Sequence, residues 1–534
     1  MQRTLGTIIG GSLADGLTMR VNAETPLEII RTGKFVSIVT PQYKFFSLIT
    51  DMRLEVSHPD ILLFPPGEHE QLLMSVLALK DMYATAVVRP MVVLNDRKQV
   101  LPVKIVPQHF SPVVEAQEED ITTIFGDERD PSGRYFAVGS PLGMKSPICL
   151  DLEKITERSN GIFGKTGTGK TFLTRLVLAG LIKNNKAVCV IFDMHSEYGL
   201  QARKEGNQEL FVKGLRTLFP DKVAIFSLDP LSTQRRGGSP DMVISLSYQS
   251  ISVEDLLSLQ EELHLHSTAY EAAYLLSARY KQDWLAVLLS HGERLKDLAN
   301  DVGAHPESIA ALYRKLKQIE RLPFFVPSPQ GEEPSENIID RMMEFIDRGI
   351  SIIIEFGNYT STFCYLLLAN LITRKIHHMY TRKTERFLGS HRKQDEPQKL
   401  MIVIEEAHKF LNSQAARQTI FGTIAREMRK YYVSLLVVDQ RPSGIDPEIV
   451  SQLGTRIIAQ LHDEKDIQSV LMGAHNIQQL RVVLSSLDSK KQVLLLGHAL
   501  AMPIVIETRS YDDQFYQAMI QQVKPLHDMI NEIF

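Results

Sequence analysis

The segment Gly164-Lys165-Thr166-Gly167-Thr168-Gly169-Lys170-Thr171 matches the phosphate-binding pattern G-x-x-x-x-G-K-[ST] at every fixed position. Residues 161–163 before it are typical of a short buried strand, and residues 172–179 after it have the apolar spacing of a helix. A loop that joins a strand to a helix N-terminus directs backbone N–H groups at an anion, which the helix dipole also favours. The segment therefore predicts an α/β fold with a nucleoside triphosphate site.

Two side chains of this loop have expected chemical roles. Lys170 is expected to reach the β- and γ-phosphates, and the hydroxyl of Thr171 is expected to coordinate Mg²⁺. The alternative is a glycine-rich surface turn, which the complete match and its flanking elements disfavour. The expected cofactors are ATP and Mg²⁺.

Length and composition are those of a large globular protein. A chain of 534 residues predicts two to four domains, and 44% hydrophobic with 23% charged residues gives no sign of disorder. The net charge of −4 excludes an overall basic footprint, so any contact with DNA must come from local basic segments.

The cysteines and the apolar runs bear on the compartment. Cys149, Cys189 and Cys364 have no C-x-x-C spacing, which indicates reduced buried thiols and no zinc site. There is no apolar leader, and no apolar run approaches the roughly 18 residues that span a bilayer. We expect a cytoplasmic protein without a membrane anchor.

Strand and helix patterns divide the chain into five segments. Short β-branched runs between Gly, Pro and Asp turns predict a small β-barrel over residues 1–112. Long apolar runs separated by helical segments predict an α/β core with a mainly parallel sheet over residues 113–249 and 336–505. An α-helical insertion is expected at 250–335 and a tail at 506–534. The runs are residues 4–9, 35–39, 91–94 and 100–106 in the barrel, and 187–192, 223–228, 350–356, 400–404, 434–438, 456–461 and 492–496 in the core.

Within the insertion, residues 295–303 followed by 309–316 faintly resemble a DNA-binding helix-turn-helix. Two packed helices joined at Gly303 are the other interpretation, and the commoner one in helical bundles. The sequence favours the second.

The apolar run 400–404 ends in two carboxylates, which indicates a Walker B strand. Parallel strands present their carboxyl ends at the ligand-binding edge of an α/β sheet. Glu405 is expected to hold the hydration shell of Mg²⁺, and Glu406 to orient and deprotonate the attacking water. Glu197, just beyond another strand end, is a second candidate for the base.

Three further groups of polar residues have candidate roles. Gln440, after the run 434–438, is a candidate γ-phosphate sensor, and the helix end 424–431 supplies arginines that either cap the helix or act across a subunit boundary. The loop 234–239, with Arg235 and Arg236, suits a channel loop that follows phosphates, although a solvated loop is the commoner case. The basic residues 382–399 have the same two interpretations, and a solvated surface is again the commoner case. His408 is expected to pack or couple instead of acting as a base.

Together, the phosphate-binding loop, the strand ends 192–198 and 404–408, the segment 426–431 and the turn 440–443 resemble the HerA family of the HerA/FtsK superfamily. The resemblance spans nearly the whole chain, including the N-terminal barrel and the helical insertion, and implies that the α/β core is RecA-like. It implies a homohexameric ring that hydrolyses ATP at subunit interfaces and translocates double-stranded DNA. It also implies a partner such as a NurA-type nuclease or another effector enzyme.

By the same resemblance, Arg158 and Arg429 contact nucleotide across the interface. The sequence departs from the family pattern at Glu405, where Asp is usual, and at Met428, where Gly is usual. The second departure leaves open whether Arg426 or Arg429 acts in trans.

Three functions fit these expectations. The leading one is a DNA translocase or helicase that powers DNA end processing or a defence complex. The alternative is an ATP-gated ring scaffold that organises an effector enzyme, with little movement along DNA. A secretion or conjugation coupling ATPase shares the engine but normally needs a membrane anchor.

Overall fold

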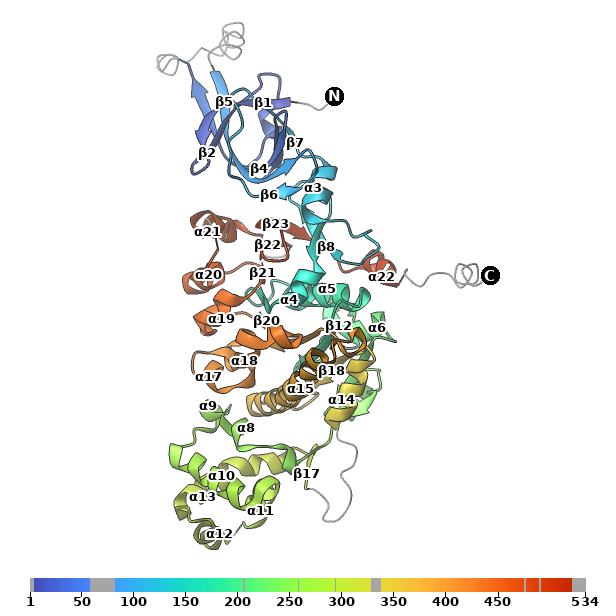
Figure 1. Ribbon diagram of the computed structural model, residues 1–534, viewed down its shortest axis with the longest axis vertical. Coiled ribbons are helices and arrows are strands. Elements are labelled where there is room, and N and C mark those ends of the chain that lie inside the picture. Colours follow the sequence, from blue (N-terminus) through green and yellow to red (C-terminus); the bar gives the residue numbers. More distant parts are fainter. Residues whose placement is uncertain are drawn as a thin grey trace, which may run out of the picture. The chain divides into compact units, whose positions relative to one another are not determined.

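The computed structural model describes residues 4–57, 82–204, 207–257, 259–292, 294–327, 338–474, 477–488 and 491–520. The chain divides into two compact units. Figure 1 shows the chain with colours that follow the residue number. The first comprises Met1–Asp151 with Leu495–Arg509, and the second comprises Leu152–Leu494 with Ser510–Phe534.

The first unit contains the expected β-barrel. Among the described residues, six antiparallel strands close on themselves because β2 pairs with β5 as well as β1, in the order β2-β1-β7-β3-β4-β5. A short β6 pairs antiparallel with the C-terminal end of β5. Inward side chains such as Leu5, Met19 and Val113 form its buried core. The strands are β1 (Thr4–Ser12), β2 (Gly16–Val21), β3 (Phe35–Val39), β4 (Tyr43–Val56), β5 (Met82–Asn95), β6 (Val100–Leu101) and β7 (Pro112–Glu115).

Two details of the barrel differ from expectation. The strand expected over 100–106 stops at Leu101, because Pro102 and Pro107 have no N–H to donate to a neighbouring strand. The barrel also extends past residue 112, since β7 pairs with both β1 and β3.

The first unit also contains residues that the sequence assigned elsewhere. After α3 (Glu118–Phe125), the strands β8 (Tyr135–Pro141) and β9 (Ile148–Asp151) form an antiparallel pair, and β8 also pairs with β23 (Ile504–Thr508). Hydrogen bonds between β8 and β23 thereby place part of the expected tail in a sheet.

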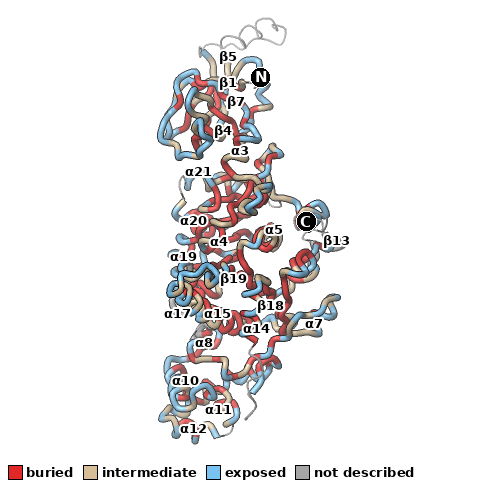
Figure 2. Tube along the Cα trace, turned by 45° about the vertical axis from the view of Figure 1, so that its right-hand side comes forward, coloured by how far each residue is buried: buried red, intermediate tan, exposed pale blue. Residues whose placement is uncertain are grey.

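The second unit is built on a parallel sheet, and all seven strands expected for the core are present. From β15 to β21 the order is β15-β14-β18-β11-β19-β20-β10-β21, with parallel pairing throughout, and β22 follows β21. Their near-continuous apolar sequences are buried on both faces (Figure 2). The strands are β10 (Asn160–Phe163), β11 (Val188–Asp193), β14 (Val223–Ser227), β15 (Met242–Val243), β18 (Ser351–Glu355), β19 (Leu400–Glu405), β20 (Val433–Asp439), β21 (Thr455–Ile458) and β22 (Gln492–Gly497).

Helices cover both faces of this sheet. Figure 1 shows α18, α19 and α20 on one side of the strands, with α5 and α14 on the other. The helices of this layer are α5 (Lys170–Lys183), α14 (Ile338–Asp347), α15 (Thr362–Ser390), α18 (Ile420–Glu427), α19 (Pro447–Gln452), α20 (Glu464–Leu471) and α21 (Ile477–Ser486). Shorter elements are α4 (Leu152–Glu157), β12 (Gln201–Lys204), β13 (Asn207–Lys213), α6 (Leu215–Leu218), α7 (Pro230–Arg235), β16 (Leu246–Ser247), β17 (Phe325–Val326), α16 (His408–Leu411), α17 (Ala415–Gln418) and α22 (Asp513–Ile520).

The expected helical insertion lies between β16 and β17. Its helices are α8 (Val253–Leu257), α9 (Gln260–Leu263), α10 (Ser267–Tyr280), α11 (Trp284–Ser290), α12 (Leu295–Val302) and α13 (Pro306–Leu316). A bidentate ion pair fixes it to α15: Arg374 donates to the two oxygens of the buried Asp255 at 2.8 and 2.7 Å.

The cysteines and the apolar helices were both subjects of expectation. Cys149, Cys189 and Cys364 are unbridged and buried, as predicted. Across the described ranges, no helix is both long enough and apolar enough to cross a membrane.

Candidate active site

The phosphate-binding loop connects β10 to α5, as predicted. Gly167 and Gly169 have φ angles of 81° and 86°, a left-handed conformation that side-chain-bearing residues rarely adopt. Lys170 begins α5, and its Nζ donates to the carbonyl oxygen of Lys165 at 3.0 Å, so the ammonium lies over the loop. Thr171 lies in the first turn of the same helix. The loop conformation therefore suits an anion at the N-terminus of α5.

A hydrogen-bonded chain joins this loop to the two neighbouring strand ends. The hydroxyl of Thr166 donates to Gln440 Oε1 at 2.7 Å, and Gln440 Nε2 donates to Glu406 Oε1 at 3.4 Å. Gln440 follows β20 and Glu406 follows β19. A side chain that touches both the phosphate loop and the candidate base can report the state of one to the other.

Glu406 is held in an uncommon backbone conformation. Its φ angle is +50°, in the left-handed region, where a non-glycine residue is strained. The following turn is fixed by Asp439 at the end of β20, which accepts from the His408 backbone N–H at 2.6 Å and lies 3.0 Å from His408 Nδ1. His408 Nδ1 is also 3.7 Å from Glu406 Oε2. The hydrogen bond to Asp439 raises the pKa of His408, which shifts the ring towards its cationic form beside Glu406.

Glu405 occupies the last position of β19 and is half-buried. The hydroxyl of Tyr198 donates to Glu405 Oε1 at 2.7 Å, and that of Tyr365 contacts its main-chain groups at 3.1 and 3.2 Å. Burial raises the pKa of Glu405 to about 8, and the negative charges of Asp193, Glu197 and Glu406 act in the same direction. A cation beside this carboxyl would favour its charged form.

Glu405 is one of four acids that end adjacent strands of the sheet. Asp193, Glu355 and Asp439 hold the last positions of β11, β18 and β20. Burial raises the pKa of Asp193 to about 7, with a further contribution from the charge of Glu355. Sequence reasoning gave no role to these three acids, although each follows an apolar run as Glu405 does. With the loop of α5, this edge makes the second unit a P-loop nucleoside triphosphatase.

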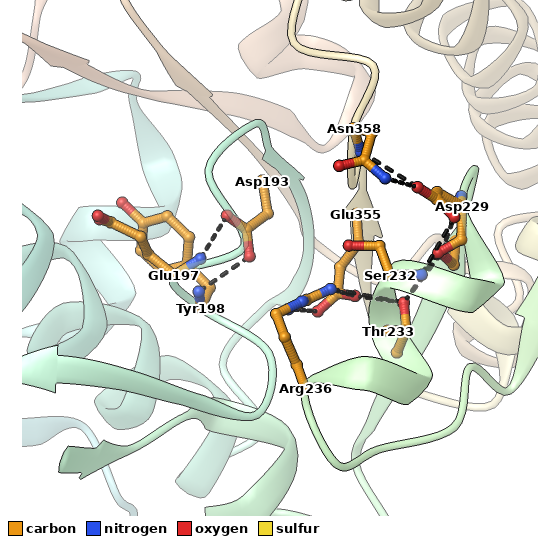
Figure 3. A network of polar contacts seen from close by, with 10 residues as sticks. Asp193, Glu197, Tyr198, Asp229, Ser232, Thr233, Arg236, Glu355 and Asn358 are labelled. Carbon is orange, nitrogen blue, oxygen red and sulfur yellow. Dashed lines mark hydrogen bonds and ion pairs between the residues drawn. The ribbon is translucent and has the colours of Figure 1, made fainter.

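Arg236 does not belong to an exposed channel loop. Its guanidinium donates to Glu355 Oε2 at 2.6 Å and Oε1 at 3.3 Å, and Thr233 donates to the same carboxylate at 2.8 Å (Figure 3). The side chain of Glu355 is fully buried, so it needs this cation. Arg235 alone of the pair is exposed. The solvated loop that the sequence favoured holds for Arg235, whereas a buried acid 119 positions away engages Arg236, a contact that neither interpretation of the loop included.

The second candidate base, Glu197, lies in the loop after β11. Its backbone N–H donates to Asp193 Oδ1 at 2.8 Å, and its carbonyl oxygen accepts from Arg175. These bonds fix the main chain of the loop. Figure 3 shows Glu197 next to Tyr198, with Asp193 accepting from the backbone N–H of each. Glu406, in contrast, has a direct side-chain link to Gln440.

The candidate trans arginines lie in different settings. Arg158 follows α4 and is exposed. Arg426, on α18, donates to the carbonyl oxygen of Ala416 at 3.1 Å and lies 3.7 Å from Glu448. Its own chain therefore engages Arg426. Arg429 lies in the short 3₁₀ helix Met428–Tyr431 that follows α18, and its side chain is outside the described residues.

One residue near the loop was missed by the sequence analysis. Lys165 Nζ lies 2.8 Å from Nε2 of His462, which comes from the segment after β21. Because an ammonium group only donates, this ring nitrogen must accept the bond. No motif marks His462, and only the crossover of the sheet brings it to the loop.

Comparison with known proteins gives matches over both units. Residues 136–376 match the family model described as "Helicase HerA, central domain", and residues 5–99 match the HAS barrel domain. A protein of Saccharolobus solfataricus named DNA double-strand break repair helicase HerA is 24% identical over 95% of this chain and 93% of its own length. The protein of that name from Sulfurisphaera tokodaii is also 24% identical, over 80% of this chain and 79% of its own. Among solved structures, VirB4 of Thermoanaerobacter pseudethanolicus aligns over 71% of this chain and 98% of its own at 13% identity, with a TM-score of 0.46.

Proposed function

Because the chain belongs to the HerA family, we propose that it is an ATP-driven motor that moves along double-stranded DNA. The observation that carries this proposal is the chain of contacts Thr166–Gln440–Glu406, which links the phosphate loop to the candidate base. A motor needs such a link, because hydrolysis must change the position of a structural element. Relatives named as DNA repair helicases support DNA as the substrate.

The residues at the strand ends fit a nucleotide and a divalent cation. Lys170 lies over the glycine loop, and Thr171 and Glu405 would hold Mg²⁺ with one hydroxyl and one carboxylate, a small set of protein ligands that suits this ion. Within the described residues no cluster of three or more His, Cys, Asp or Glu could enclose a metal alone. Bound Mg²⁺ would neutralise phosphate charge as it develops during transfer.

The protein's own groups divide the chemistry between binding and water activation. Lys170 and the loop amides bind the phosphates. Glu406 accepts the proton of the attacking water, and its strained backbone holds the carboxylate towards Gln440. Asp439 fixes His408, which in turn lies against Glu406 and orients it.

We propose that arginines of a second subunit neutralise the negative charge that develops in the transition state. Arg158 is exposed, whereas Arg426 is engaged within its own chain, which favours Arg429 over Arg426 as the other trans arginine. A site completed in this way requires a closed ring, for which the family relationship suggests six subunits. A NurA-type nuclease or another effector enzyme in the cytoplasm completes the proposed assembly for DNA end processing or defence.

DNA-stimulated ATP hydrolysis tests the proposal. Purified protein should form rings in negative-stain images, and linear duplex DNA should raise its rate of phosphate release. An ATP-gated scaffold would form rings yet hydrolyse at the same rate with and without DNA. That outcome would refute the motor and favour the scaffold.

A further inference from the structure

The helical insertion contains a helix-turn-helix. Helices α12 and α13 are joined at Gly303, whose φ of 70° ends α12, and the N–H of Ala304 closes the turn on the carbonyl oxygen of Ala299 at 2.9 Å. The side chain of His305 then caps α13 by accepting from the backbone N–H of Glu307. The turn is thus fixed at both ends by local hydrogen bonds.

A third helix holds the pair in place. Helix α10 packs against both α12 and α13, as the group in the lower part of Figure 1 shows. Leu298, Ile309 and Leu312 are buried between the helices, and the fully buried Ala299 is small enough to let α13 cross close to α12. Three helices packed in this way leave the outer face of the last helix exposed to solvent.

The exposed side of α13 carries two alanines and, towards its C-terminus, exposed cations. Ala310 and Ala311 are partly exposed, and their methyl groups leave room for close approach. Beyond them, the helix carries exposed cations. The exposed cations of this region are Arg294, Lys296, Arg314, Lys315, Lys317 and Arg321.

Fewer acids face the same solvent. Four acids, Asp297, Asp301, Glu307 and Glu320, are exposed against six cations, and Asp301 also accepts from the Tyr280 hydroxyl at 2.5 Å and pairs with Arg279 at 3.6 Å. The surface around α13 is therefore basic on a chain with a net charge of −4. Such local concentration of cations is complementary to a polyanion.

We propose that α12, Gly303 and α13 form a binding site for double-stranded DNA that is separate from the motor. Arg314 and Lys315 contact phosphates, and the alanine face of α13 lies in the groove, whose width admits a helix. Methyl groups read few base edges, so binding is largely independent of sequence. This inference goes beyond the proposed motor, because it requires neither ATP nor hydrolysis.

Salt-dependent binding of a labelled linear duplex to the full chain, without nucleotide, tests the site. For Arg314→Ala/Lys315→Ala, the slope of log affinity against log salt should become shallower by roughly 0.9 for each lost phosphate contact. The matched control is Arg97→Ala/Lys104→Ala, which removes two exposed cations on either side of β6 and should leave the slope unchanged. An unchanged slope in the first variant, or equal changes in both, would overturn the proposal.

A crosslinking variant keeps the test decisive if the double variant misfolds. Since the three native cysteines are buried, Lys315→Cys supplies an accessible thiol for a photoactivated crosslinker. We expect crosslinks to duplex DNA from Lys315→Cys and not from Lys104→Cys. Crosslinks only to protein would instead identify α13 as a protein-docking surface and exclude DNA. The motor proposal is tested separately, because its failure would appear as the absence of DNA-stimulated hydrolysis in the unmodified protein.

Discussion

The half-buried Arg236 pairs with the fully buried Glu355 across 119 positions of the sequence, with guanidinium-to-carboxylate distances of 2.6 and 3.3 Å. Arg235, its neighbour, is exposed to solvent. Two adjacent arginines therefore have different settings, one within the fold and one at its surface.

Replacing each of these arginines should separate the two roles. Arg236→Ala leaves the buried Glu355 carboxylate without its cation, so the free energy of unfolding should fall by about 3–5 kcal/mol. Arg235→Ala should change it by less than about 0.5 kcal/mol. Denaturant unfolding measures both. Adding Glu355→Gln to Arg236→Ala should recover part of the loss, and equal effects of the two single variants would contradict the assignment.

Nucleotide binding and turnover should respond to different substitutions. Lys170→Ala removes the cation over the phosphate loop and should abolish productive ATP binding. Glu406→Gln retains binding and should lose turnover by at least about a hundredfold, because an amide cannot accept the proton of water. Nucleotide titration and phosphate release measure the two steps. Normal turnover in Glu406→Gln would move the base to Glu197.

Magnesium affinity should depend on pH through Glu405. Burial raises the pKa of this carboxyl to about 8, so below that pH the ion must displace a proton. Apparent Mg²⁺ affinity should therefore rise with pH, by up to about tenfold per unit, and level off above about pH 8. Magnesium titrations of nucleotide binding at several pH values provide the measurement. In Glu405→Gln the affinity should be weaker and this pH dependence absent; the same slope in both proteins would exclude Glu405 as the ligand.

His408 should affect turnover through the position of Glu406. His408→Ala removes the ring that lies between Asp439 and Glu406, and should slow turnover by roughly tenfold to a hundredfold with little change in nucleotide affinity. The effect should vanish in a Glu406→Gln background, because the two substitutions act on one step. Additive losses in the double variant would show that His408 acts elsewhere.

Mixed rings should reveal arginines that act in trans. Arg158→Ala and Arg429→Ala rings should each hydrolyse poorly, yet regain activity when mixed with Glu406→Gln subunits, since some interfaces then combine two intact halves. Arg426→Ala is the comparison, because its cis contacts with Ala416 and Glu448 predict no rescue. Phosphate release across several mixing ratios measures this. Mixed rings, verified by mass, that show no rescue for Arg158 would remove it from the interface.

The sequence predicts what depends on local pattern. The phosphate loop, the strand run 400–404 with its two acids, and the barrel all follow from residue type and spacing, because glycine conformation and apolar periodicity are local properties. The sequence also predicts two packed helices joined at Gly303, the interpretation it favoured over a DNA-binding helix-turn-helix, and the structure adds α10 packed against both.

The contacts of long sequence separation could not be predicted. The segment around Arg236 has the composition of a phosphate-binding loop, and only the pairing of β14 with β18 brings this arginine to Glu355. Likewise, His462 approaches Lys165 because β21 lies beside β10. Side-chain partners across a parallel sheet depend on strand order, which local propensity does not encode.

The pairing of β8 with β23 has a consequence for synthesis of the chain on the ribosome. The first unit includes Met1–Asp151 but is completed by Leu495–Arg509, roughly 340 residues later. At about 5–20 residues per second, β8 waits roughly 20 to 70 s for its partner strand, with an unpaired edge exposed meanwhile. The nascent protein is therefore most open to mispairing with other chains during that interval, and a chaperone that covers β8 would act then.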